Sequence, residues 1–236
     1  MPPAVRIVGH GRAGGSLAGA LRSIGWTVDV VDHGRAPRAA RDVDLLILAV
    51  PDDAVASVAA SVLPVDTAVV AHMAGSLGLD VLEPHPRRAS LHPLVALPNV
   101  ELGARRLSGA WFAVAGEPVV NDVIDALGGH AFVVDDEHRA VYHAAAVIAS
   151  NHLVALLAQV ERVAAAADVP LEAYLDLVRA TVDNVAALGP ADALTGPAAR
   201  GDEATIQRHL AALPVEEREL YEVLADACRR LAACKS

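Results

Sequence analysis

The order of apolar and polar positions predicts strands that alternate with helices over the first 135 residues. Short apolar or β-branched runs, each followed by a helical pattern, are typical of a doubly wound parallel sheet in an α/β fold. The runs are Val5–Val8, Trp26–Asp32, Asp44–Val50, Thr67–His72, Trp111–Ala115 and His130–Val134. The run at 44–50 is almost wholly apolar, which favours a central strand that is buried on both faces.

The pattern changes after Asp136, because no strand period follows. Helices are predicted over 137–167, 171–188 and 203–210, and from Pro214 onward, with Asp202 as a helix N-cap. The sequence therefore predicts a Rossmann-type domain over 1–135 and a smaller all-helical domain over 136–236.

The most apolar stretch lies in the first of these helices, at 144–160. Ser150, Asn151 and His152 interrupt it at its middle, which a membrane span would place there only with a functional need. We interpret this stretch as a buried helix of a soluble protein.

A glycine pattern stands between the first strand and the first helix. Gly9, Gly11 and Gly14 follow the strand with the spacing Gly-x-Gly-x-x-Gly, which is the dinucleotide-binding fingerprint in this context. The first glycine permits the turn, the second lets the backbone approach a pyrophosphate, and the third lets the helix pack on the strand. The predicted phosphate-binding residues are Gly9, His10, Gly11, Arg12, Ala13 and Gly14.

Two readings compete at the end of the second strand. Asp32 lies where an acid binds the adenosine ribose of NAD. His33, Arg35 and Arg38 follow at once, and cations there suit the 2′-phosphate of NADP. The expected cofactor is therefore NADP or NAD.

The third strand ends in residues that should line the same cleft. Ligands of open α/β sheets lie beyond the carboxyl ends of the strands, so Val50 and Pro51 are predicted to contact the cofactor. For Asp52 we favour a structural role as a helix N-cap.

Composition narrows the class of partner. The chain has 236 residues, a formal net charge of −10 and 54% hydrophobic residues. An acidic chain without a basic cluster argues against nucleic acid, and the start of the chain has no signal-peptide pattern. Cys228 and Cys234 are six residues apart on a predicted helix, so a disulfide is not expected and a reducing cytoplasm suits them.

Polar groups on the first long helix are the candidates for catalysis. With 100° per residue, Arg139, His143 and Ser150 share a stripe about 40° wide, and Asn151 lies at its edge. We predict His143, Ser150 and Asn151 as catalytic residues; the alternative is that His143 and Asn151 only satisfy neighbouring backbone groups.

Substrate-binding residues are expected in three further places. His72 and His92 end strand-like runs on the cleft side. The irregular segment from Thr195 to Asp202 contains Arg200, whose guanidinium could hold a carboxylate. A connecting turn is the alternative for that segment. The histidines lack metal-ligand spacing, so no metal is expected.

These residues together resemble a known arrangement. A Rossmann domain followed by a helical domain resembles the 6-phosphogluconate-dehydrogenase-like superfamily, which includes ketopantoate and pyrroline-5-carboxylate reductases. More closely, the chain resembles a family that pairs a Rossmann-like domain with a helical domain of unknown function, number 2520. The residues that carry this likeness are Gly9–Gly14, His72, His92–Leu94, Tyr142–Ala146, Ala149–Asn151, Ala193–Pro197, Arg200–Asp202 and His209–Leu210.

The resemblance implies an NAD(P)H-dependent reductase of a small oxo acid or imine, with a ketopantoate-type substrate as the first expectation. The superfamily typically has a lysine and an asparagine on the first long helix. Asn151 matches the amide, whereas His143 stands in for the lysine as proton donor. A dinucleotide-binding sensor or scaffold without turnover and a deazaflavin-dependent enzyme remain alternatives. The resemblance also implies a homodimer through the helical domain. No membrane partner is expected, because Ser150, Asn151 and His152 interrupt the most apolar stretch.

Overall fold

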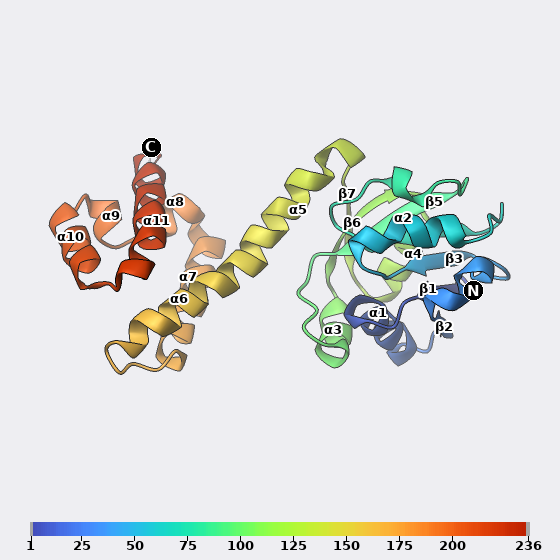
Figure 1. Cartoon of the computed structure of the whole chain (residues 1–236), viewed down its shortest axis with the longest axis horizontal. Helices are drawn as coiled ribbons and strands as arrows, with labels where there is room; N and C mark the ends of the chain where they lie inside the picture. The colour runs from blue at the N-terminus through green and yellow to red at the C-terminus, as the bar shows by residue number, and fades with distance from the viewer. Residues whose placement is uncertain (1, 235–236) are drawn as a thin grey trace. The chain divides into compact units, whose positions relative to one another are not determined.

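Residues 2–234 are described by a computed structural model, which divides the chain into two compact units. The first unit comprises residues 1–150 and the second residues 151–236. Figure 1 shows the sheet and its helices in the first unit and only helices in the second.

A seven-stranded sheet in the order β2-β1-β3-β4-β5-β6-β7 forms the centre of the first unit. The strands are β1 (Val5–Val8), β2 (Val28–Val31), β3 (Leu45–Leu48), β4 (Val69–His72), β5 (Arg88–Pro93), β6 (Trp111–Gly116) and β7 (His130–Val133). The first five run parallel, but β6 pairs antiparallel with β5, and β7 follows the direction of β6. The α/β class is confirmed, with the correction that the sheet is mixed.

Helices cover both faces of this sheet. They are α1 (Arg12–Ser23), η1 (His33–Arg38), α2 (Asp52–Ser61), η2 (Leu79–Leu82), α3 (Val100–Leu107) and α4 (Val119–Ala126). In β3, Leu45 and Ile47 join the core that α1, α3 and α4 cover, whereas Leu46 and Leu48 join the core under η1, α2 and η2. The unbroken apolar run of β3 thus follows from burial on both faces, as predicted.

The long helix after β7 has a more complex course than expected. It runs through η3 (Asp136–His138), α5 (Arg139–Val147), the π-helical turn η4 (Ile148–His152) and α6 (Leu153–Ala165). The boundary between the compact units, at 150/151, falls inside η4.

The apolar surface of this helix is not buried within the chain, which corrects the expectation of a buried helix. Val141, Ile148 and Val154 are 66%, 59% and 67% exposed. By length and composition alone, 136–165 could cross a membrane. The apolar periodicity of 136–165 is that of a core helix, so periodicity alone did not predict the exposure of these side chains.

The second unit is a cluster of helices: α6, α7 (Glu172–Leu188), α8 (Pro190–Ala193), α9 (Pro197–Arg200), α10 (Glu203–Ala212) and α11 (Val215–Ala233). Arg162 of α6 forms an ion pair with the buried Glu217 of α11, and Gln159 donates a hydrogen bond to the Glu217 carbonyl. The Asp202 carboxylate accepts from the Thr205 backbone N–H at 3.1 Å and caps α10, as predicted.

The parallel strands bring their carboxyl ends to one edge of the sheet. Val8 of β1 lies beside Leu48 of β3, Leu48 lies beside His72 of β4, and His72 lies beside Ser90 of β5. Residues that follow these positions therefore meet along one edge, which spans about 14 Å from β1 to β5 for strands about 4.8 Å apart.

Candidate functional site

The turn after β1 is so tightly packed that two of its glycines cannot carry a side chain. A Cβ at Gly9, whose φ is +107°, would lie 2.4 Å from the Ala49 carbonyl oxygen. A Cβ at Gly14 would lie 2.1 Å from the Gly9 carbonyl oxygen. The fold itself therefore requires these two glycines, because they let β1, β3 and α1 meet at the sheet edge.

Gly11 differs from both, because a Cβ there would meet nothing within 4 Å. This residue is the N-cap of α1, and no side chain caps the helix there. The first N–H groups of a helix lack intrahelical partners and attract anions. The open space at Gly11 thus fits the approach of a pyrophosphate, and the exposed Arg12 begins the helix beside it.

At the end of β2, Asp32 pairs with a residue of the glycine turn. The His10 Nδ1 and Asp32 Oδ1 atoms are 2.9 Å apart, and both side chains are exposed. His33 and Arg35 are also exposed, in η1. The acid and the cations thus both lie at the cofactor edge, and the choice between NAD and NADP stays a prediction.

The end of β3 brings Val50 and Pro51 to the same edge, directly after the Ala49 that packs on Gly9. Asp52 is not the N-cap that we favoured, because Pro51 holds that position and Asp52 is the first residue of α2. Its carboxylate instead accepts a hydrogen bond from the Ser76 hydroxyl at 3.3 Å. An acid in the first turn still complements the helix dipole.

Three histidines that are far apart in the sequence come together at β4 and β5: His72 ends β4, His92 lies near the end of β5, and His143 is on α5. His92 and His143 have ring centroids 5.5 Å apart. A Cβ at Gly75 would lie 2.6 Å from His143 Nδ1 and 2.9 Å from His92 Nε2, so both rings border this glycine. His72 is fully buried, and its Nε2 lies 3.2 Å from the Gly78 carbonyl oxygen.

Tyr142 completes the cluster and was not among the predicted site residues. Its hydroxyl lies 2.7 Å from His92 Nδ1, and the two rings meet edge to face. Sequence periodicity placed His143 on the cleft side but gave no weight to its neighbour. The available signals were its position next to His143 and its place among the residues that carry the family likeness, Tyr142–Ala146.

Arg139 anchors α5 to the sheet. This side chain is 1% exposed, and its Nη2 donates to the hydroxyl of the buried Ser90. Its Nε and Nη1 atoms have no hydrogen-bond partner among the described residues, nor do His72 Nδ1 and His143 Nδ1. Unpartnered buried polar groups are costly, so their gathering in one region marks it as a candidate functional site.

The electrostatics of the cluster disfavour added positive charge. Burial lowers the pKa of His92 to about 4, with smaller contributions from His143, Arg139 and His72. Burial likewise lowers the pKa values of His72 and Arg139, and it raises the pKa of Tyr142 to about 12. His92 is consequently neutral at physiological pH.

Ser150 and Asn151 lie in the π-helical turn η4, which corrects the predicted stripe. The stripe assumed an α-helical 100° per residue throughout, but a π turn is wider and changes the facing of the residues in it. Such turns occur frequently at functional sites. The catalytic roles of His143, Ser150 and Asn151 stay predictions.

The predicted substrate residues of the second unit have local roles there. Asp202 caps α10 and also accepts from the Thr205 hydroxyl at 2.7 Å. Arg200 is the exposed last residue of α9, and Thr195 is exposed in the segment before it. Their contact with a substrate stays a prediction.

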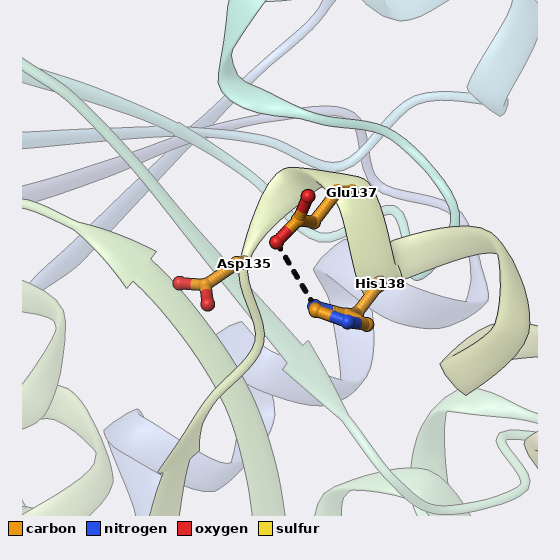
Figure 2. Close-up of side chains that lie close together, drawn as sticks. All are labelled: Asp135, Glu137 and His138. Atoms are coloured by element: carbon orange, nitrogen blue, oxygen red, sulfur yellow. Dashed lines mark ion pairs between the residues drawn. The ribbon is translucent and has the colours of Figure 1, made fainter.

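One group of possible metal ligands occurs at the start of the long helix. Asp135, Glu137 and His138 place ligand atoms within 4.8 Å of one another, and all three are exposed. In Figure 2 the Glu137 carboxylate faces the His138 ring, and the two form an ion pair at 3.8 Å. Asp135 and His138 also line a shallow hollow of about 340 Å³ beside Tyr142. Exposed acidic groups of this kind are common on protein surfaces.

We expect Gly11→Ala and Gly14→Ala to separate cofactor binding from folding. At Gly11 the backbone accepts a side chain, so stability should change by less than about 1 kcal/mol while NADPH affinity falls at least about tenfold. At Gly14 the added Cβ strikes backbone, so the free energy of unfolding should fall by about 1–3 kcal/mol. Urea unfolding and NADPH fluorescence titration measure both. If NADPH affinity is unchanged in Gly11→Ala, the glycine turn does not bind the phosphates as proposed.

We expect acid to destabilise the folded chain through His92. The unfolded imidazole has a pKa near 6.5, so between about pH 6.5 and pH 4 the unfolded state binds more protons than the folded one. The free energy of unfolding should therefore fall as pH falls through this window. His92→Gln should flatten the slope, as measured by urea unfolding at several pH values. Equal slopes in both proteins would contradict the buried neutral imidazole.

Comparison with known proteins supports the architecture. Residues 113–228 match the family model described as a domain of unknown function, DUF2520. The matched region begins inside β6, so it includes the end of the sheet as well as the helices. No curated protein matches the sequence.

Solved structures match over almost the whole chain. A Bacteroides fragilis protein provisionally named as an NADP oxidoreductase aligns with a TM-score of 0.81 at 20% identity, covering 97% of this chain and 98% of that one. A Thermotoga maritima protein gives a TM-score of 0.75 at 22% identity over 98% of both chains. The pyrroline carboxylate reductase of Plasmodium falciparum, solved with NADP, gives 0.63 at 13% identity, also over 98% of both.

These likenesses establish the fold and agree with the family expected from the sequence. The expected fold, a Rossmann-type sheet followed by helices, is confirmed by these structures. Residues 113–228 thus match the DUF2520 model, and the chain as a whole shares its fold with these solved structures.

Proposed function

We propose that this chain is an NAD(P)H-dependent reductase of a small oxo acid or imine. The proposal rests on the presence of two groups of residues at the same edge of the sheet. The glycine turn with its open helix N-terminus lies after β1, and the cluster of His72, His92 and His143 lies at β4 and β5. The 14 Å or so between them suits a dinucleotide that lies across the carboxyl edge.

The named relatives support this class of reaction. Besides the pyrroline carboxylate reductase, the matched structures include a reductive aminase of Aspergillus terreus in complex with NADPH and an imine reductase of Myxococcus stipitatus in complex with NAD⁺. A ketopantoate-type substrate remains our first choice among oxo acids, on the family resemblance alone.

The roles of the residues follow from their chemistry. A bound nicotinamide supplies the hydride. His143, which borders Gly75 with an unpartnered Nδ1, donates the proton to the reduced oxygen or nitrogen. Asn151 orients the substrate through its amide, Ser150 offers a hydroxyl, and Arg200 holds a carboxylate.

We propose that the residues at η1 discriminate between NADP and NAD at the adenosine end of the cofactor. Asp32 is held by His10 at 2.9 Å and is therefore engaged before a ribose arrives. Arg35 and His33 are exposed and free to meet a 2′-phosphate. NADP is the form that this arrangement favours, with NAD as the alternative.

A sensor or scaffold that binds the nucleotide without turnover is the second candidate. The observation that favours it is the missing lysine, because the sole lysine of the sequence is Lys235. A deazaflavin cofactor in place of a nicotinamide is a third outcome that the same experiment detects.

Cofactor binding and oxidation distinguish these functions. We expect NADPH, and less strongly NADH, to raise the melting temperature, since a ligand at a hundred times its Kd stabilises by about 2.7 kcal/mol. NADPH oxidation should then occur with at least one member of a panel of oxo acids and cyclic imines. His143→Ala should lower the rate by a factor of about 10² or more and leave NADPH affinity unchanged. Binding without oxidation across the panel would favour the sensor, and a shift with deazaflavin alone would favour the third reading.

We propose that the exposed apolar helix faces are covered by a second copy of this chain in the cytoplasm. Ile148, Val154, Leu177 and Leu188 are 59%, 67%, 63% and 59% exposed, and exposed apolar patches mark interaction sites. Ser150 and Asn151 would be costly in lipid but are acceptable between subunits. Cys228 and Cys234 are both free, in keeping with a reducing compartment.

Sedimentation velocity tests this assembly. The chain should sediment as a dimer at micromolar concentration, and Ile148→Glu or Val154→Glu should shift it toward the monomer because a charge would be buried. The control is Leu63→Glu, an apolar position after α2 that is 49% exposed, which should leave the dimer intact. If the chain is monomeric and binds phospholipid vesicles, the exposed helix faces bind a membrane and not a second copy.

A further inference from the structure

We propose that Tyr142 holds His92 as a neutral hydrogen-bond donor, with Nε2–H on the side of Gly75, where it polarises the C=O or C=N group of the substrate. Tyr142 is thereby a positioning residue that acts through His92. The role toward substrate rests on the proposed function, whereas the state of the imidazole does not.

The geometry gives each nitrogen of His92 a separate partner. Nδ1 lies 2.7 Å from the Tyr142 hydroxyl, with the rings edge to face at 84°. Nε2 lies on the side of Gly75, where a Cβ would be 2.9 Å from it and 2.6 Å from His143 Nδ1. Two imidazole nitrogens thus lie against the same glycine, at a point where the loop contributes no side chain.

The direction of the Tyr142 hydrogen bond follows from relative acidity and basicity. A phenol is a better donor than a neutral imidazole N–H, and an imidazole nitrogen is a better acceptor than a phenol oxygen. Tyr142 therefore donates to Nδ1, and the remaining proton of the neutral ring must be on Nε2. This assigns the tautomer from the hydrogen bond that the other nitrogen makes.

The surroundings of the ring keep it uncharged. His72 on β4 and Arg139 and His143 on α5 all oppose a proton on His92, and burial opposes it most. Asp52 and Asp136 act on His72 rather than on His92. With a pKa of about 4, His92 remains neutral at pH 7 and is a poor choice for the group that gives up a proton.

The two histidines then divide the chemistry. His92 donates a hydrogen bond to the oxygen or imine nitrogen and keeps its proton, so that negative charge developing on this atom is stabilised. His143, as the imidazolium, gives a proton to the same atom: one ring N–H bond breaks, one O–H or N–H bond forms, the ring is left neutral, and solvent restores its proton. The substrate atom must therefore retain a lone pair for His92, which selects ketones and neutral imines over iminium ions.

The first test is the tautomer itself. In protein labelled with ¹⁵N in its histidine rings, we expect one neutral form of His92 with Nε2 protonated, unchanged from pH 5.5 to pH 8. Tyr142→Phe should convert it to a mixture of tautomers. A protonated Nδ1 in the wild-type protein would overturn the proposal, and this measurement needs neither the variant nor turnover.

A matched pair in the second unit provides the control. The Tyr221 hydroxyl lies 2.6 Å from His209 Nδ1, and these rings also meet at 84°. Tyr221→Phe should alter the His209 signals and leave those of His92 unchanged. If Tyr142→Phe leaves the His92 tautomer as it is, the positioning role is refuted.

Kinetics then test the role toward the substrate. Tyr142→Phe should lower kcat about tenfold, which is the scale of one lost hydrogen bond, and should leave NADPH affinity unchanged. The activity of the variant should also fall at low pH, because a larger fraction of His92 is then not in the neutral form with a proton on Nε2. Equal kcat values would overturn this role. If no oxo acid or imine is reduced by the wild-type protein, the proposed function fails, while the tautomer still decides the state of His92.

Discussion

The lack of room between Gly9, Ala49 and Gly14 is the constraint on which the first unit depends. The turn after β1 lies against the backbone after β3, and α1 begins where a side chain at Gly14 would strike the Gly9 carbonyl oxygen. This contact brings the start of α1 to the carboxyl edge of the sheet. The helix N–H groups therefore face the edge at which β4 and β5 present their histidines.

The other end of this edge is organised by a buried cation. Arg139 reaches from α5 to Ser90, the residue of β5 that lies beside His72. This bond fixes α5, and α5 in turn supplies Tyr142 and His143 from consecutive positions. Burial of the Arg139 charge costs free energy, but this charge also helps to lower the pKa values of His72 and His92. Structure and chemistry thus depend on the same side chain.

Local patterns were sufficient to predict the glycine turn and the parallel strands. Gly9, Gly11 and Gly14 have a spacing whose meaning is local, and the run at 45–48 could only be a strand covered on both sides. The direction of β6 was not predictable, because an antiparallel neighbour depends on long-range pairing and has the same apolar pattern. The π turn at 148–152 was missed for a related reason: a period of 3.6 residues was assumed where one turn is wider. Tyr142 escaped because its partner, His92, is fifty residues away.

Gly75 has no special backbone angle and would pass unnoticed in the loop after β4. Its importance lies in what it omits, since any β-carbon there would separate the two imidazole rings that border it. A chain with alanine at this position could not keep both rings where they are. In a related sequence, a glycine that follows the fourth strand at this distance would therefore be a marker for paired histidines.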